Sequence, residues 1–137
     1  MSLLANIRFV QFGDLGGVCA RFLETLGAVR DEAVTSATDI IIDGRETSAA
    51  RYQAEADQIL VRLTPFGLDG PYAGYLGSEL VCSAMGGTLI GTGYEDLPPV
   101  KEALDACIFH AEGVAAAGAL FAPVSYTHLT LPTKRIV

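Results

Sequence analysis

The spacing of apolar residues along the chain predicts an alternation of strands and helices. Runs rich in β-branched and aromatic side chains are typical of strands, and they lie at 7–12, 39–43 and 58–64. After the first run, a Gly turn opens a segment at 16–27 whose apolar positions recur at helical spacing. The second run is apolar throughout, as expected for a strand buried on both faces of a parallel sheet. This order predicts an α/β, Rossmann-like fold with a small, mostly parallel sheet and flanking helices.

Three further helices are predicted from composition and apolar runs. The segment 46–56 is rich in Ala, 78–85 is apolar, and the small residues of 104–121 allow a helix to pack closely against a neighbour. The segments at 65–77 and 86–99 contain most of the Gly, Pro and Tyr of this region and are predicted to be loops. Loops of this length in a small domain are usually functional.

The C-terminal residues 124–137 break with the preceding pattern. They begin Val-Ser-Tyr-Thr-His-Leu-Thr-Leu-Pro-Thr, which resembles one translated reading frame of a transposase adapter used in DNA sequencing libraries. We therefore interpret 1–123 as the native part and 124–137 as a non-native tail, which we expect to pack poorly on the domain. The native gene is expected to continue past Pro123, so the predicted fold is truncated.

Composition excludes several classes of function. Half of the residues are hydrophobic and 18% are charged, which excludes intrinsic disorder. The formal net charge is −7 with singly scattered basic residues, so no nucleic-acid partner is expected. No apolar stretch reaches the ~20 residues of a membrane span, and no signal-peptide pattern opens the chain, which predicts a cytoplasmic protein. The spacing of Cys19, Cys82 and Cys107 predicts buried thiols and no metal site.

The turn between the first strand and the first helix is a candidate anion site. It reads Gly13-Asp14-Leu15-Gly16-Gly17, and glycines allow backbone N–H groups to approach a phosphate at a helix N-terminus. Gly13, Asp14 and Gly16 are therefore candidate binding residues. The turn does not match G-x-G-x-x-G, so a simple connecting turn explains it equally well. A nucleotide-binding enzyme would also need an acidic residue at the end of the next strand, where Asp43 stands.

The loop after the third strand is a second candidate site. Ligands of open α/β sheets bind outside the carboxyl ends of strands, and this loop begins there. A turn-forming surface loop would explain its Gly and Pro residues but not its two aromatic residues. The candidate binding residues are Thr64, Pro65, Phe66, Gly67, Gly70, Pro71 and Tyr72.

Several motifs in a fixed order carry a family resemblance. Leu-Thr-Pro-Phe-Gly-Leu-Asp-Gly-Pro-Tyr at 63–72 is followed by Ala-Met-Gly-Gly at 84–87, Gly-Thr-Gly at 91–93 and Pro-Pro-Val at 98–100. This series resembles the signature core of the family III CoA-transferases, also called CaiB/BaiF. The resemblance implies coenzyme A or an acyl-CoA as substrate, transfer of CoA between carboxylic acids, no metal, and an interlocked homodimer or a fused second half.

The departures from the family pattern concern catalysis. Members that transfer CoA use one Asp as nucleophile, and alignment of the following helix places Ile108 at that position. The nearest carboxylate is Asp105, a candidate nucleophile or an acid stabilised by the helix dipole. His110 is a candidate for proton transfer or an ordinary side chain. In addition, Glu79 replaces a usual Asp, and 29–36 is too short for the family's next strand and the segment after it.

These departures resemble the degenerate half of fused members, in which a second half performs catalysis. The leading hypothesis is therefore a fragment of a family III CoA-transferase that binds an acyl-CoA or supports a catalytic partner half. Two alternatives remain open from the residues. The first is a Rossmann-type nucleotide-binding enzyme, suggested by the glycine turn, and the second is a non-catalytic interaction module, favoured by Ile108.

Overall fold

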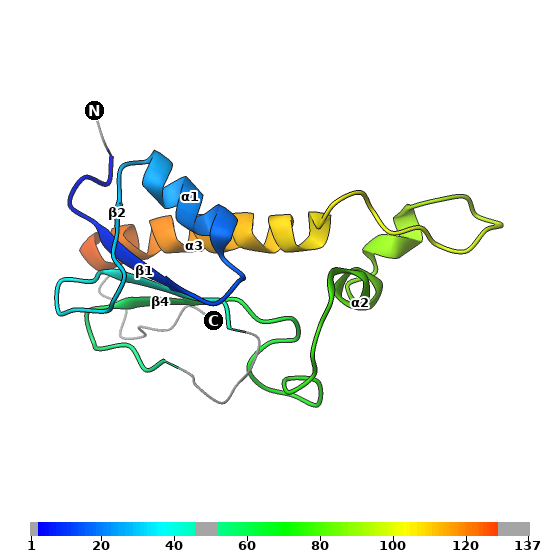
Figure 1. Ribbon diagram of the computed structural model, residues 1–137, viewed down its shortest axis with the longest axis horizontal. Helices are drawn as coiled ribbons and strands as arrows, with labels where there is room; N and C mark the ends of the chain where they lie inside the picture. Colours follow the sequence, from blue (N-terminus) through cyan, green and yellow to red (C-terminus); the bar gives the residue numbers. More distant parts are fainter. Residues whose placement is uncertain (1–2, 46–51, 129–137) are drawn as a thin grey trace.

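The chain folds around one open parallel sheet (Figure 1). The computed structural model describes residues 3–45 and 52–128, with side chains described as far as residue 122. The sheet contains β1 (Arg8–Phe12), β2 (Val29–Arg30), β3 (Ile40–Asp43) and β4 (Ile59–Arg62), in the order β2-β1-β3-β4. Every pairing between these strands is parallel, which confirms the predicted α/β, Rossmann-like class.

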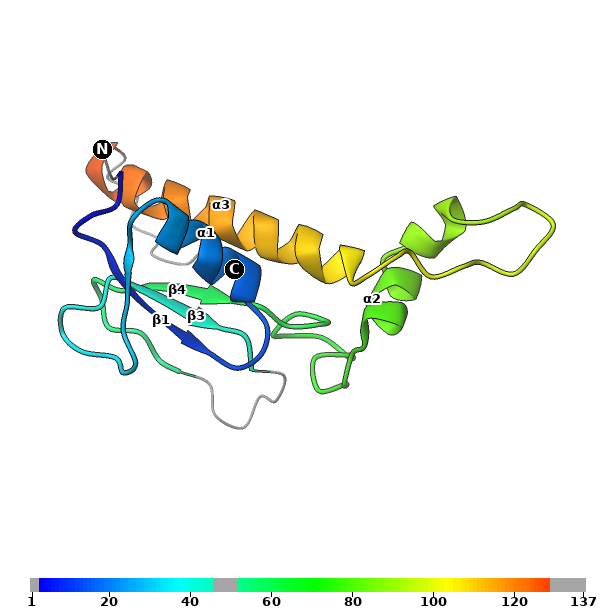
Figure 2. The same ribbon diagram turned by 45° about the horizontal axis from the view of Figure 1, so that its top comes forward.

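Two helices cover the same face of the sheet. Helices α1 (Gly17–Thr25) and α3 (Ala106–His128) lie side by side above the strands in both ribbon views (Figures 1 and 2). Between these helices and the sheet lies the apolar core. Its largest buried members are Phe9, Leu23, Ile40, Ile42 and Leu63.

The most completely buried strand is β3. All four of its residues are buried, and Ile40 and Ile42 belong to the core beneath the helices. Ile41 points to the opposite face and is also fully buried. Burial of one such side chain stabilises a fold by ~1.5–3 kcal/mol, so this short strand contributes strongly to the folding free energy. The prediction that it is buried on both faces is confirmed.

Small side chains let α3 approach the rest of the domain closely. Ala116, Ala119 and Ala122 recur every three residues and are buried. The helix extends beyond its predicted end at 121 to His128, and so includes the first residues of the predicted tail. The rest of the tail, 129–137, lies outside the described residues, and its poor packing remains a prediction. None of the described helices is both long and apolar enough to cross a membrane.

Two local expectations were wrong. The predicted absence of a strand after Ala28 is corrected by β2, which is only two residues long and pairs with the start of β1. Of the helix expected over 46–56, the part at 46–51 lies outside the described residues, and 52–55 have no helical structure. There the backbone of Tyr52 is held from both sides: its N–H donates to Asp43, and its carbonyl accepts from Arg62.

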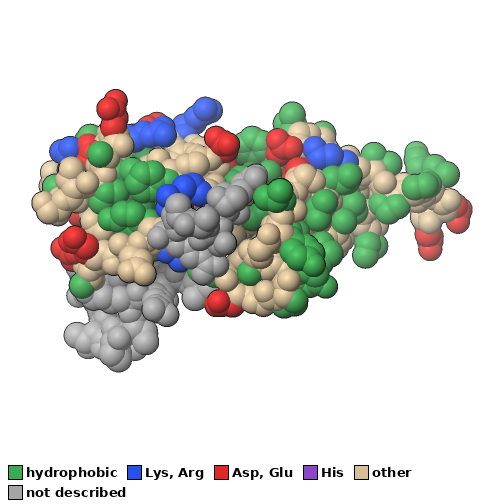
Figure 3. All heavy atoms as spheres, turned by 60° about the horizontal axis from the view of Figure 1, so that its bottom comes forward, with side chains coloured by type: hydrophobic (Ala, Val, Ile, Leu, Met, Phe, Trp, Pro, Cys, Tyr) green, Lys and Arg blue, Asp and Glu red, His purple; other side chains and the backbone are tan. Residues whose placement is uncertain are grey.

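An extended arm, residues 77–104, projects beyond the sheet in Figure 1. It contains α2 (Glu79–Met85) and the short 3-10 helix η2 (Thr88–Gly91). The helix predicted at 78–85 is confirmed by α2. Ser78 caps it, because the Ser78 side chain accepts a 3.4 Å hydrogen bond from the Val81 N–H. The hydrophobic side chains of this region are largely exposed, as the space-filling view shows (Figure 3). They are Leu80, Val81, Met85, Ile90, Tyr94, Leu97, Val100 and Leu104.

Candidate functional site

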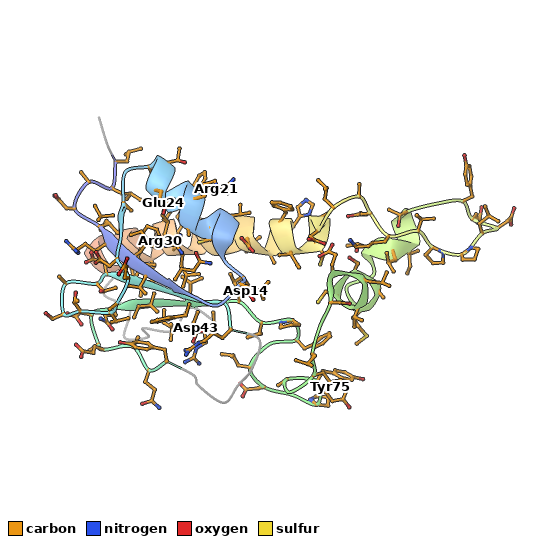
Figure 4. All side chains as sticks on the ribbon, in the orientation of Figure 1. Asp14, Arg21, Glu24, Arg30, Asp43 and Tyr75 are labelled. Carbon is orange, nitrogen blue, oxygen red and sulfur yellow. The ribbon has the colours of Figure 1, made fainter. Side chains whose placement is uncertain are left out.

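The carboxyl ends of β1 and β3 define the candidate site. The chain leaves β1 toward β2 on one side and returns to β3 on the other, so the strand order reverses between these two strands. In open α/β sheets, ligands bind outside the carboxyl ends of the strands at this point. Phe12 and Asp43 are register partners there, and Figure 4 shows Asp14 and Asp43 at this same edge.

Two glycines allow the loops at this edge to touch. A Cβ on Gly13 would lie 2.7 Å from the carbonyl carbon of Gly44, and a Cβ on Gly44 would lie 2.0 Å from the Leu15 oxygen. Gly13 also has a φ of 78°, which favours glycine. Backbone contact between the two loops therefore explains both glycines without a ligand.

The start of α1 is occupied by a carboxylate from the same chain. Glu112, on α3, is only 5% exposed and accepts hydrogen bonds from the N–H groups of Gly16, at 3.0 Å, and Val18, at 2.5 Å. A Cβ on Gly16 would lie 2.5 Å from Ile42 Cγ2, so packing explains this glycine too. The sequence left two interpretations open here, a phosphate cradle and a simple connecting turn. In the structure, two of its amides already bind an internal anion, as the helix dipole favours.

Of a polar and aromatic cluster at the carboxyl ends of β1, β3 and β4, sequence reasoning had considered Asp43 but not its partners. Arg45 binds the buried Asp43 carboxylate with two hydrogen bonds of 2.7 and 2.8 Å, and its guanidinium lies 5.1 Å from the centroid of the Phe12 ring. The Tyr52 ring stacks on Phe12 at 6.0 Å. Arg62, at the end of β4, is the register partner of Asp43. A charged Asp-Gly-Arg directly after a buried strand was the available signal.

The electrostatics of Asp43 follow from this cluster. Burial by itself would raise the pKa of Asp43, but hydrogen bonds from the Arg45 guanidinium and the Tyr52 N–H outweigh it, so the pKa lies below its ordinary value. The carboxylate is therefore held charged and engaged by Arg45. It is not free to bind a ribose, which leaves the nucleotide-binding alternative without its acidic residue.

The candidate binding loop begins next to this edge and runs away from it. Leu63, the residue before this loop, packs against Gly16 at the start of α1: a Cβ added to Gly16 would lie 3.4 Å from Leu63 Cδ1. Thr64, the next residue, therefore follows close to the start of α1. Further along, three aromatic rings gather: Phe66 and Tyr72 at 6.3 Å, and Tyr72 and Tyr75 edge to face at 5.6 Å. Figure 4 shows Tyr75 well apart from Asp14 and Asp43. Thr64 therefore lies next to the edge, whereas Pro65 lies against Gly77 at the base of the arm, where an added Cβ would come 2.3 Å from the Pro65 Cβ. Tyr72 lies farther out.

The turns of this loop depend on its glycines. Gly67 and Gly70 have φ values of 82° and 101°, in the left-handed region that glycine prefers. Neither would meet any atom within 4 Å if a Cβ were added, so backbone conformation rather than packing requires glycine there. Pro71 and Tyr72 are exposed.

The start of α3 is held by a second internal carboxylate. Glu79, on α2, is 7% exposed and accepts hydrogen bonds from the N–H groups of Cys107, at 2.7 Å, and Ile108, at 3.0 Å. Ser83 adds a hydroxyl donor at 3.3 Å. The residue noted in the sequence only as a replacement for Asp is thus a buried helix cap between two elements.

The candidate catalytic groups near this helix start lie at the surface. Asp105 has a side chain that is 60% exposed and forms a 3.3 Å ion pair with Lys101. His110 is exposed, with Nδ1 2.7 Å from the Ala106 carbonyl oxygen. Ile108 is half-buried and offers no titratable group. The geometry favours the helix N-terminal interpretation of Asp105, because its carboxylate already has a cation as partner.

The cysteines differ in their surroundings. Cys19 is buried, and burial together with the charge of Glu112 raises the pKa of its thiol to about 11. Cys82 and Cys107 are only half-buried, so the expectation of buried thiols is wrong for these two. They lie where the arm meets α3, a junction with less surrounding structure than the core. Among the described residues, no group of three or more potential metal ligands comes together.

These features define an α/β protein with an open parallel sheet. Its strand order reverses between β1 and β3, which is the place where ligands bind in open α/β sheets. No protein-family model matches the chain. The chain is 34% identical over 99 residues to the succinyl-CoA:(R)-benzylsuccinate CoA-transferase subunit BbsE of Thauera aromatica. The match covers 72% of the chain but 24% of that relative, so the chain spans about a quarter of the relative's length. The chain is therefore related to a CoA-transferase subunit.

Proposed function

We propose that the chain is the N-terminal part of a family III (CaiB/BaiF) CoA-transferase and that it binds an acyl-CoA at the carboxyl edge of its sheet. The similarity to a CoA-transferase subunit carries this proposal. The loop at 64–72 follows β4 at the edge where open α/β sheets bind ligands, which supports this location. Coenzyme A enters as substrate, and the chain's own chemistry requires no metal.

In this proposal, a second unit supplies the catalytic carboxylate. In the family reaction, an Asp carboxylate attacks the acyl thioester, which forms a mixed anhydride and releases CoA as a thiolate. The thiolate then attacks the aspartyl carbonyl, which forms the aspartyl-CoA thioester and releases the acyl group as a free carboxylate. Ile108 stands at that position, and Asp105 is exposed and paired with Lys101. The relative is named as a subunit, which supports assembly with another chain or a fused half.

The division of the chain is part of the proposal. Residues 1–123 form the native fragment, and 124–137 derive from a translated adapter. The test is to sequence the source locus from unamplified DNA. We expect unrelated codons after Pro123, followed by a further transferase-like unit with its own catalytic Asp. The same fourteen codons at the locus would contradict this interpretation.

Binding of acyl-CoA can be tested on the chain itself by calorimetric titration with acetyl-CoA. We expect Tyr72→Ala to weaken binding several-fold, because Tyr72 belongs to the aromatic cluster of the candidate loop. The control is Tyr94→Ala, since Tyr94 is 81% exposed on the arm, and it should bind as the unchanged chain does. Failure of the unchanged chain to bind would refute the proposal of acyl-CoA binding.

The location of the nucleophile requires the extended protein. Its transfer of CoA between two acids should persist in Asp105→Ala, and hydroxylamine should trap the thioester on a carboxylate outside residues 1–123. A trapped Asp105 would show that this part carries the active site.

The exposed arm favours a second candidate function, a non-catalytic interaction module. Its apolar side chains lack a covering layer among the described residues, and surfaces of this kind commonly bind another protein surface. This candidate predicts that the chain associates with its partner unit while binding no acyl-CoA. The titration described above therefore separates the two functions.

A further inference from the structure

Arg62 has an unusual environment at the edge of the sheet. It is the last residue of β4 and the register partner of Asp43, and its side chain is half-buried on the face opposite α1 and α3. One Nη donates to the Tyr52 carbonyl. Its Nε is the single buried side-chain nitrogen or oxygen atom without a hydrogen-bond partner in the described part of the chain. Buried donors in folded proteins are nearly always satisfied, so this atom requires an explanation.

The neighbouring carboxylate does not neutralise Arg62. Asp43 is engaged by two hydrogen bonds from the Arg45 guanidinium, and it also accepts from the backbone N–H groups of Arg45 and Tyr52. The three side chains Asp43, Arg45 and Arg62 together carry one excess positive charge, in a chain whose net charge is −7. A half-buried guanidinium without a counter-ion is costly, because desolvation is not offset by a partner. Among the described residues, the cluster thus lacks one anion.

We propose that Arg62 binds a phosphate group of the CoA moiety. This inference rests on the proposed function, since the anionic groups of CoA are its phosphates. A guanidinium presents a planar set of donors that matches phosphate oxygens, and the Tyr52 carbonyl holds this one in place. Its position at the carboxyl end of β4 is where ligands of open α/β sheets lie. The Arg45 side chain also belongs to the cluster, but its charge is already paired with Asp43.

The test compares ligands with and without phosphates on the 137-residue chain. CoA and pantetheine are titrated into the unchanged chain and into Arg62→Gln, Arg62→Lys and Arg21→Gln. Loss of Arg62 should weaken CoA binding about tenfold or more, as expected for a charge-assisted hydrogen bond, and leave pantetheine binding unchanged. Arg62→Lys keeps the charge and should lose less. Arg21 is exposed on α1, on the other face of the sheet, so its variant is the matched control for a lost charge.

Each outcome separates this inference from the proposed function. If the unchanged chain binds CoA and Arg62→Gln binds it equally well, Arg62 is not the phosphate site and the proposed function stands. If the unchanged chain binds ADP but not CoA, and Arg62→Gln no longer binds ADP, then Arg62 belongs to an anion-binding site but the proposed function is refuted. If Arg62→Gln does not fold, competition on the unchanged chain decides: inorganic phosphate should displace CoA but not pantetheine. Equal affinity for CoA and pantetheine would also overturn the inference.

Discussion

Replacement of Glu112 by Gln tests the internal carboxylate at the start of α1. The Glu112 carboxylate is buried and accepts from two backbone N–H groups, at 3.0 and 2.5 Å, which lie 96 and 94 residues earlier in the chain. Each hydrogen bond to a charged group contributes ~1.5–3 kcal/mol. Gln keeps one acceptor oxygen but leaves the second amide without a partner and removes the charge at the helix dipole. We therefore expect the free energy of unfolding to fall by ~2–4 kcal/mol, a large part of the ~5–15 kcal/mol typical of a domain.

Urea unfolding with a matched control measures this loss. The control is Glu95→Gln, which removes the same charge from an exposed position on the arm and should change stability by less than ~0.5 kcal/mol. Hydrogen exchange supplies a local readout, because the Gly16 and Val18 amides should lose protection only in the Glu112 variant. If the two variants have equal urea unfolding midpoints and the Gly16 and Val18 amides stay protected in both, Glu112 does not cap α1.

A second variant at this position, Glu112→Ala, decides between an internal cap and a ligand cradle. If the two amides serve only Glu112, their release in Glu112→Ala opens an anion site, and millimolar sulfate should stabilise that variant more than the unchanged chain. Equal stabilisation of both proteins would show that the start of α1 binds anions even with Glu112 in place.

Three further outcomes are expected. Gly44→Ala should lower the free energy of unfolding by ~1–3 kcal/mol, because its Cβ would lie 2.0 Å from the Leu15 backbone oxygen. The control Gly17→Ala should not, since its Cβ would meet no atom within 4 Å, and urea unfolding midpoints compare the two variants. The lowered pKa of Asp43 stabilises the fold above the unfolded pKa of ~3.9, and this stability is lost as the pH falls through the lower folded pKa. Arg45→Gln removes the hydrogen bonds that lower this pKa, so acid unfolding of the variant should start at higher pH. Asp105→Ala should change the urea midpoint little, since its ion pair with Lys101 is exposed; a loss above ~1 kcal/mol would contradict this.

Local pattern was sufficient for most of the sheet and its first helix. The runs that became β1, β3 and β4 are short and rich in β-branched or aromatic residues, which indicates strands. The run of β3 is almost wholly apolar, because this strand is buried along its whole length. The spacing of Val18, Phe22, Leu23 and Leu26 predicted α1, and of these Leu23 is buried while Phe22 is exposed. Cys19 and Ala20 complete the buried face of the helix. In contrast, β2 has two exposed residues and forms only because β1 offers an unpaired edge, which no local signal reveals.

The site was harder to predict because its decisive contacts join distant segments. Glu112 and Glu79 each satisfy amides of another element, and a single acidic residue on a helix gives no sign of its partner. The glycines at 13 and 16 were predicted to approach a phosphate, while in the structure they approach backbone and Ile42. A glycine indicates close approach but does not identify the group that comes close.

The Glu112 cap has a consequence for synthesis of the protein on the ribosome. Strands β1 to β4 and α1 emerge first, and they can pair and collapse while the chain is still growing. The first turn of α1, however, acquires its acceptor only when residue 112 leaves the exit tunnel. Until then two amides depend on water, and the apolar face meant for α3 stays open. The nascent domain is therefore a target for chaperones until α3 is added, and translation pauses before that helix should increase its aggregation.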